Sequence, residues 1–405
     1  MRTAWPRILF GLVVVAVLAG ALTVVNLRFT RVSPGGNDFL PRWMGTRMFI
    51  TERYSPYSAE TTAAIQDRMY GRNAEEGEDE ALFAYPFYSM LLFAPFALVE
   101  DYPLARALWI TAQEIAIAAL VLAGLGATGW RPSRGPLVAL LLFALIWFHS
   151  AKPLVDGNAA VLVALFVSLG VLAMRRNRDG LAGMAFALST IKPQMVLLVL
   201  VFTLAWALSH KRRSLVGSFI VSLLALIGAS FALQPDWAAQ NLAQVVAYGS
   251  YAPPGTLISI LDTWWGQTGH TVGLVLSALL GLLLFFEWGS AMRQRFDWFM
   301  WAVCLTLVLG PFVGMPSTSS NHVILLIVVM WLLAWWQRRT GQPRAVWVLL
   351  PILFVGVWAL FLLTLGEGDG QFREHLSLLL ATPLFLLANL YWLRWWLLRP
   401  GGVSV

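Results

Sequence analysis

One carboxylate stands where acid–base chemistry at a membrane surface would need it. Asp38 follows the pair Gly35 and Gly36, in a polar segment that emerges directly from the first long apolar run. The glycines loosen the backbone before the acid, and from Pro41 to Thr51 the pattern predicts a short amphipathic helix lying on the interface. We therefore expect Asp38 to be held beside the bilayer. The alternative interpretation is an ordinary loop aspartate that caps this helix.

Four polar stretches are expected on the same face of the membrane. Ionisable side chains at the ends of apolar spans are costly to place there and therefore indicate function. The four stretches are Asp38 with Asn37, Arg42 and Arg47; His149 to Asn158, with Lys152 and Asp156; Ile191 to Gln194, with Lys192; and Pro316 to His322, with Asn321. Their conjunction is a stronger signal than any single stretch.

Each stretch also has a simpler explanation, which the sequence leaves open. Lys192 needs no ligand if it snorkels to lipid head groups, although a lone lysine on the side that the positive-inside rule depletes argues for an anionic contact. His322 needs no ligand if it is hydrogen-bonded within a helix bundle. Lys152 and Asp156 need none if they pair with each other.

The composition indicates a polytopic membrane protein before any motif is considered. Hydrophobic residues make up 59% of the 405 residues and charged residues only 12%, and the mean hydropathy is +0.70. A soluble domain of this length does not have such values. The net charge is +7, but the basic residues lie in short clusters between apolar runs, which indicates membrane topology and no nucleic-acid partner. The single cysteine, Cys304, excludes an intramolecular disulfide and a cysteine-based metal site.

Twelve apolar segments are candidate spans, because a membrane helix needs roughly 20 apolar residues and shorter ones suffice where the barrier is thinned. They run over 8–27, 104–126, 135–149, 157–174, 180–193, 194–209, 214–233, 271–290, 297–314, 321–337, 344–365 and 376–398. The first lacks a small-residue cleavage site, which predicts an uncleaved span.

The basic residues orient these twelve segments. Clusters at 2–7, 131–134, 175–178, 211–213, 293–295, 338–344 and 394–399 hold 17 of the 28 basic residues and fall on one side. The positive-inside rule assigns that side to the cytoplasm. We expect a multi-pass protein of the cell membrane with both termini in the cytoplasm and the four polar stretches on the outer face.

The outer loops are unequal in this arrangement. Residues 28–103 form the largest and 234–270 the second, while 150–157, 315–320 and 366–375 are short. The apolar stretch from Phe83 to Val99 contains Pro86 and Pro95, which predicts a helix in the outer interface and not a span.

Two further features lie in the first outer loop. The motif Ser55 to Tyr57 predicts a turn into a second short helix, from Ala59 to Tyr70. The acidic run from Glu75 to Glu80 is typical of a solvated tip, and it lacks the ligand spacing of a metal site. The sequence contains no nucleotide-binding glycine motif and no soluble catalytic domain. Any substrate must therefore arrive through the lipid.

The order of the short motifs resembles glycosyltransferase family 87, the polyprenyl-phosphate-mannose-dependent membrane mannosyltransferases of the GT-C superfamily. The resemblance extends to about residue 340. The motifs are Asn37-Asp38-Phe39, Ser55-Pro56-Tyr57, Tyr85-Pro86, His149 with Pro153, Gly157-Asn158, Gly183, Ile191-Lys192-Pro193 and Ser317 to His322. The chain carries Asn158 and a single histidine, His322, where the family commonly has glutamine and a histidine pair.

The resemblance implies an all-α GT-C fold of about twelve transmembrane helices, with interfacial helices and a catalytic aspartate in the first outer loop. That aspartate corresponds to Asp38. Such enzymes transfer a sugar from a lipid-linked phosphate donor to a lipid or glycan acceptor and invert the anomeric centre.

The chemistry of the residues agrees with these roles. Transfer from a sugar phosphate needs a base for the acceptor hydroxyl and cationic groups for the leaving phosphate. Asp38 is the candidate base. The candidate phosphate contacts are Lys192, Arg42, Arg47, Lys152 and His322, and Gln194, Asn158 and His149 are candidate hydrogen-bonding groups for sugar or phosphate. A polyprenyl phosphate leaves as a stable anion, so the reaction demands no metal and no other cofactor.

Two other classes of protein stay open. A lipid-linked sugar transporter or flippase would also have many spans, but such proteins usually show an internal repeat and charges near mid-span, and we find no repeat. A non-catalytic polyprenyl-phosphate-binding subunit would account for the phosphate contacts without a base. Substitution of Asp38 separates an enzyme from both.

Overall fold

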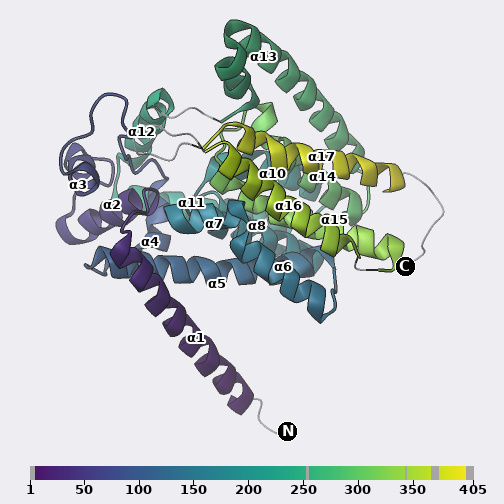
Figure 1. Cartoon of the computed structure of the whole chain (residues 1–405), viewed down its shortest axis with the longest axis horizontal. Helices are drawn as coiled ribbons and strands as arrows, with labels where there is room; N and C mark the ends of the chain where they lie inside the picture. The colour runs from purple at the N-terminus through teal and green to yellow at the C-terminus, as the bar shows by residue number, and fades with distance from the viewer. Residues whose placement is uncertain (1–4, 252–254, 343, 366–373, 398–405) are drawn as a thin grey trace. The chain divides into compact units, whose positions relative to one another are not determined.

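The computed structural model describes residues 5–251, 255–342, 344–365 and 374–397, and every regular element within these ranges is a helix (Figure 1). The first elements are α1 (Trp5–Val32), α2 (Phe39–Glu52), α3 (Ala59–Tyr70), the 3-10 helix η1 (Phe87–Ser89), α4 (Met90–Ala97), α5 (Tyr102–Thr128), α6 (Arg134–Ile146), α7 (Phe148–Asp156), α8 (Ala160–Arg175) and α9 (Asp179–Ser189). The others are α10 (Pro193–Ser209), α11 (Arg213–Leu233), α12 (Trp237–Tyr251), α13 (Leu257–Ala291), α14 (Phe296–Leu309), η2 (Gly310–Val313), η3 (Ser319–Leu325), α15 (Leu326–Thr340), α16 (Arg344–Leu363) and α17 (Ser377–Leu397). Arg2, Arg399 and 366–373 of a predicted loop lie outside the described residues.

The chain forms two compact units, of which the first comprises Met1–Ala116, Leu154–Asn158 and Ser230–Tyr251. In this unit α2 packs against α3 and α4, and η1 packs against α12. Aromatic rings fill its interior: Phe39 stacks on Trp109 with ring centroids 5.4 Å apart, and Phe93 lies 4.9 Å from Trp109. α2 confirms the predicted helix and buries 8 of its 14 residues. Its position in the membrane interface stays a prediction.

The second unit comprises Ile117–Pro153, Ala159–Ala229 and Ala252–Val405. Its core includes residues 299–309 of α14 and residues 323–334 of η3 and α15, which are all buried and almost entirely apolar. A helix that is apolar all round belongs in such a core. α8 packs against α9 and η3, and α10 packs against α14. By contrast, α13 leaves Phe285 and Phe286 69% and 68% exposed, as expected for side chains that face lipid.

Eight helices in the described part of the chain are long and apolar enough to cross a membrane, and a bent pair, α6 with α7, makes nine. The other three predicted spans coincide with α8, α9 and α10, which have 16, 11 and 17 residues. At about 1.5 Å per residue, 11 residues reach only about half of the roughly 30 Å hydrocarbon core. The eight long apolar helices make the chain a polytopic all-helical membrane protein. Because α8, α9 and α10 are short, the count of twelve membrane spans stays a prediction.

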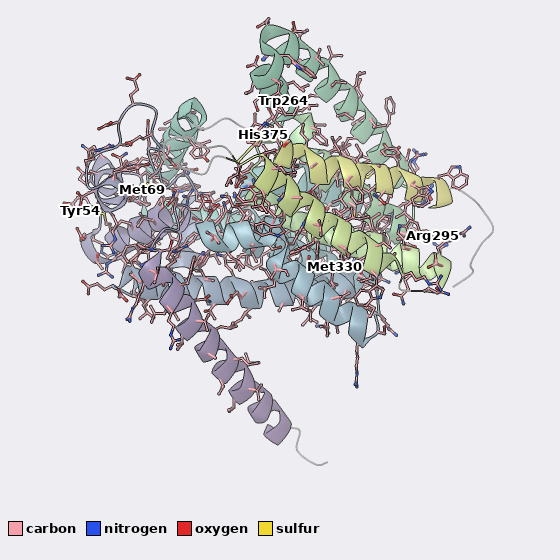
Figure 2. The ribbon with its side chains drawn as sticks, in the orientation of Figure 1. Tyr54, Met69, Trp264, Arg295, Met330 and His375 are labelled. Atoms are coloured by element: carbon pink, nitrogen blue, oxygen red, sulfur yellow. The ribbon has the colours of Figure 1, made fainter. Side chains whose placement is uncertain are left out.

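Local boundaries differ from the sequence-based expectation in two places. Residues 150–157 were expected to be a loop, but α7 occupies most of them and bends by 44° from α6. The expected loop 234–270 is largely helical, because it contains α12 and the start of α13, which kinks at Gly266 (φ 56°, ψ −141°). Near this kink Trp264 stacks on His375 with centroids 6.3 Å apart (Figure 2). The helix from Ala59 to Tyr70 is confirmed at both ends.

Candidate active site

Asp38 precedes the first residue of α2 but does not cap this helix. No capping hydrogen bond joins its carboxylate to α2, all of whose residues are described, whereas Ser58 caps α3 by accepting from the Thr61 N–H at 3.2 Å. The Asp38 Oδ2 instead accepts a hydrogen bond of 2.8 Å from the Asn158 amide, and the Asp38 N–H donates to the Asp156 carbonyl at 2.9 Å. With 34% of its side chain exposed, the carboxylate is held on one side and open on the other.

The two arginines of α2 have different surroundings. Arg42 is 7% exposed; its Nη1 lies 3.8 Å from Asp38 Oδ1, and its guanidinium lies 4.3 Å from the centre of the Tyr85 ring. Arg47 instead donates a 3.1 Å hydrogen bond to the Ala97 carbonyl at the end of α4. The first unit thus brings Arg42 and Asn158 to Asp38, while Arg47 is engaged at α4.

Arg106 and Tyr102, at the start of α5, hold the segment that leads to Asp38, and neither was among the site residues predicted from the sequence. The Tyr102 hydroxyl donates to the Gly35 carbonyl at 2.7 Å, and Arg106 is only 1% exposed. Its guanidinium donates three hydrogen bonds, of 2.5, 2.7 and 2.7 Å, to the carbonyls of Ser33, Pro34 and Val155. The sequence feature that could have indicated Arg106 is its position within an apolar run, since an arginine in such a run needs buried partners.

Two glycines permit the close packing around this segment. Gly36 and Gly157 have φ values of +80° and +76°, which side-chain-bearing residues rarely adopt. A Cβ at Gly36 would lie 2.5 Å from Arg106 Nε, and a Cβ at Gly157 would lie 2.4 Å from Phe39 Cβ. The backbone on both sides of the Asp38–Asn158 pair therefore depends on the absence of a side chain.

In the second unit, Lys192 lies immediately before α10 and points into the protein. It is 4% exposed, and its Nζ donates to Asn321 Oδ1 at 2.6 Å. This geometry does not support snorkelling, because a snorkelling lysine extends to the surface. The first turn of α10, which starts with Pro193, adds the partial positive charge of a helix N-terminus. Lysine and helix terminus together favour an anion.

His149 and His322 lie side by side in the second unit, with ring centroids 4.9 Å apart. The ring nitrogens of His149 contact the Ser319 carbonyl and Thr382 Oγ1, each at 2.9 Å. His322 is 3% exposed, yet neither of its ring nitrogens has a hydrogen-bond partner among the described residues. The explanation of His322 by a bundle hydrogen bond is therefore not supported, and its unsatisfied nitrogens favour a polar ligand.

Lys152 and Gln194 lie in the same unit in different settings. Lys152 Nζ is 3.0 Å from a carboxylate oxygen of Glu374, which also accepts a hydrogen bond from Ser319 Oγ. Glu374 was not among the predicted site residues, because it is isolated in a short predicted loop. Gln194, with Asn321 and other residues of α10, α14, η2 and η3, lines a pocket of about 40 Å³. This volume holds a few water molecules and not a whole sugar.

The candidate residues thus form one group in each unit. Asp38, Arg42 and Asn158 belong to the first, and Lys192, His149, His322, Gln194 and Lys152 belong to the second. The described residues contain no group of three or more His, Cys, Asp and Glu side chains suited to a metal ion.

Fold and site define an all-helical integral membrane protein whose polar residues include a held carboxylate and, in the second unit, a buried lysine and two buried histidines. The profile of glycosyltransferase family 87 matches residues 83–313, more than half of the chain. The chain belongs to this family and is by family a membrane glycosyltransferase, with a sugar donor and an acceptor as substrates. The matched range contains His149, Asn158 and Lys192, whereas Asp38 lies before it. Searches of curated proteins and of solved structures found no match.

Proposed function

We propose that this protein transfers a sugar, by family resemblance mannose, from a polyprenyl-phosphate-linked donor to a lipid or glycan acceptor, with inversion, at the outer face of the membrane. The observation that carries the proposal is the state of Asp38: its carboxylate caps no helix, accepts one hydrogen bond from Asn158 and stays one-third exposed. A structural aspartate would be expected to use its oxygens locally. This one is held by Asn158 and still keeps about a third of its side chain exposed for a substrate.

Asp38 is the general base of the proposed reaction. The acceptor oxygen forms a bond to the anomeric carbon while the bond from that carbon to the donor phosphate oxygen breaks on the opposite side. The acceptor proton passes to Asp38, and polyprenyl phosphate leaves with the electron pair. Asn158 fixes the orientation of the carboxylate, and the Arg42 guanidinium lies 3.8 Å from it.

Lys192 is the proposed contact of the second unit for the donor phosphate. A charge-assisted hydrogen bond from a buried ammonium is among the stronger interactions available for a phosphate, and Asn321 already orients this one. The unsatisfied nitrogens of His322 are a second proposed contact for phosphate or sugar. Lys152 is a further proposed phosphate contact, whose charge Glu374 already compensates in part.

A donor panel tests the proposal. The purified chain in nanodiscs is incubated with polyprenyl phosphates that carry mannose, glucose, galactose or arabinose, together with a panel of glycolipid acceptors. We expect release of polyprenyl phosphate and an inverted product with one donor. A flippase would move the donor between leaflets without releasing polyprenyl phosphate, and a binding subunit would retain it unchanged. Either result would contradict the proposal.

A further inference from the structure

α12 joins the candidate active site of the first unit through one polar face. This face packs against residues 55–57 and 84–88. The contacts are a hydrogen bond from Ser55 to Gln240 (2.5 Å), one from Asn241 to the Tyr85 carbonyl (2.9 Å), and two between Gln244 and the backbone of Ala84 and Tyr57 (3.0 and 3.2 Å). These contacts fix the rotation of α12 about its own axis.

Three successive contacts connect α12 with Asp38. Asn241 binds the carbonyl of Tyr85, the Tyr85 ring lies under the Arg42 guanidinium at 4.3 Å, and Arg42 lies 3.8 Å from Asp38. One further side chain lies on this face of α12, one turn beyond Gln244.

Tyr248 is that side chain. It follows Gln244 by four residues and Asn241 by seven, so all three lie on one face of the helix. Gln244 is 8% exposed, whereas Tyr248 is 41% exposed, so its ring extends beyond the packed contact. Burial around the hydroxyl raises the pKa of Tyr248 to about 12, and the negative charge of Asp38 adds to this shift. The phenol thus keeps its proton and stays a hydrogen-bond donor at any physiological pH.

We propose that Tyr248 is a substrate-contacting residue of the Asp38 site, whose ring packs against a sugar of the acceptor and whose hydroxyl donates a hydrogen bond to that sugar. This inference rests on the proposed function. The acceptor hydroxyl that loses its proton must reach Asp38, and a sugar carries further hydroxyls and an apolar face beside it. The hydroxyl of a tyrosine can bind a sugar hydroxyl, and its ring can pack against the apolar face of the sugar. The acceptor class is therefore a glycan or glycolipid whose reacting hydroxyl belongs to a sugar.

Kinetics of matched tyrosine variants test this assignment. The wild-type chain, Tyr248→Phe, Tyr248→Ala and Tyr54→Phe are compared in nanodiscs, with geranylgeranyl phosphomannose as donor and octyl α-mannoside as acceptor. We expect Tyr248→Phe to raise the acceptor KM about 3- to 10-fold, through the loss of one hydrogen bond, and to leave the donor KM unchanged. Tyr248→Ala should raise the acceptor KM further. Tyr54, labelled in Figure 2, is 43% exposed and is the control that should behave like wild type.

The outcomes separate this inference from the proposed function. The melting temperature of the Tyr248 variants should stay close to that of wild type, since Gln240, Asn241 and Gln244 make the polar contacts that fix α12. A wild-type acceptor KM in both Tyr248 variants, with activity still dependent on Asp38, overturns the role of Tyr248 alone. Absence of transfer by the wild-type chain with this pair and with every pair of the donor panel overturns the proposed function and this inference together.

Discussion

The carboxylate of Asp38 is held by an amide that lies 120 residues away in the chain. The sequence indicated both Asp38 and Asn158 as site residues, because each stands in a polar stretch beside an apolar run. It did not indicate that they pair, since a contact between distant segments depends on packing and not on local pattern. The same limit applies to Tyr248, which stands among polar and apolar residues of a short helix with no distinguishing spacing.

Alternatives that the sequence left open at single residues were decided by burial. Lys192 was compatible with snorkelling until its 4% exposure and its bond to Asn321 were known. Arg47 and Arg42 were indistinguishable by type and spacing, yet only Arg42 lies beside Asp38. The direction in which each side chain points from the packed helix distinguishes the two arginines. The sequence pattern does not reveal this direction, because it depends on the surface against which the helix packs.

We expect Lys192→Met to weaken the binding of polyprenyl phosphate. The variant keeps the length of the side chain and removes its charge, and loss of a hydrogen bond to a charged group costs about 1.5–3 kcal/mol. Fluorescence titration of the detergent-solubilised protein with geranylgeranyl phosphate measures the affinity. Lys211→Met, at an exposed position, is the matched control and should bind like wild type. Unchanged affinity in Lys192→Met would leave the lysine with a structural role and no role in binding the phosphate.

At the scale of elements, the sequence predicted the helices more accurately than the breaks between them. The pattern from Ala59 to Tyr70 gave a helix with both ends correct, because Ser58 and Gly71 are strong capping residues. The bend between α6 and α7 was not anticipated, since the run around Trp147 contains no proline or glycine before the break. The turn at Gly157 was recognisable as a Gly-Asn motif, but its tight contact with Phe39 was not.

The Gly157 turn provides a test of how precisely Asp38 must be placed. Gly157→Ala adds a Cβ that would lie 2.4 Å from Phe39 Cβ, next to Asp38, at a φ of +76°. Since a displacement of about 1 Å at a reacting group can cost about 10²-fold in rate, we expect a loss of turnover on that scale. Initial-rate assays with the identified donor and acceptor measure it.

Gly71→Ala is the matched control for that variant. Gly71 has nearly the same backbone conformation, with φ of +71°, but nothing lies within 4 Å of the added Cβ. Both variants carry the backbone penalty of about 1 kcal/mol, and only Gly157→Ala carries the clash. Equal turnover in the two variants would show that the clash at Phe39 is irrelevant to activity.

At the scale of the whole molecule, the class of protein followed from composition, and the family followed from motif order and from the match over residues 83–313. The number of membrane crossings did not follow from the sequence. The helices α8, α9 and α10 are short, so length alone does not decide whether they cross the membrane. The segment Phe87–Ala97, at about 16 Å, is as short as α9 compared with a bilayer of roughly 30 Å. That residues 28–103 stay on one side is therefore still a prediction.

Cysteine labelling tests that topology directly. The native Cys304 is fully buried and should give no background, and Glu100 is exposed. We expect Glu100→Cys in intact cells to react with an impermeant maleimide from outside, and Lys211→Cys, exposed in a predicted cytoplasmic loop, to react only after lysis. Labelling of Glu100→Cys only after lysis would place the loop on the cytoplasmic side and reverse the assignment of the outer face.

The central claim, that Asp38 is the base of a transfer reaction, is tested most directly by Asp38→Asn. This variant preserves size and most hydrogen bonding but removes basicity, and a positioned base contributes about 10²–10⁴-fold. We predict that turnover in nanodiscs falls on this scale while the affinity for the polyprenyl-phosphate donor persists. Asp156→Asn keeps the backbone carbonyl that binds the Asp38 N–H and should retain turnover. Near-native turnover by Asp38→Asn, with loss in Asp156→Asn, would contradict the account and transfer the role to Asp156.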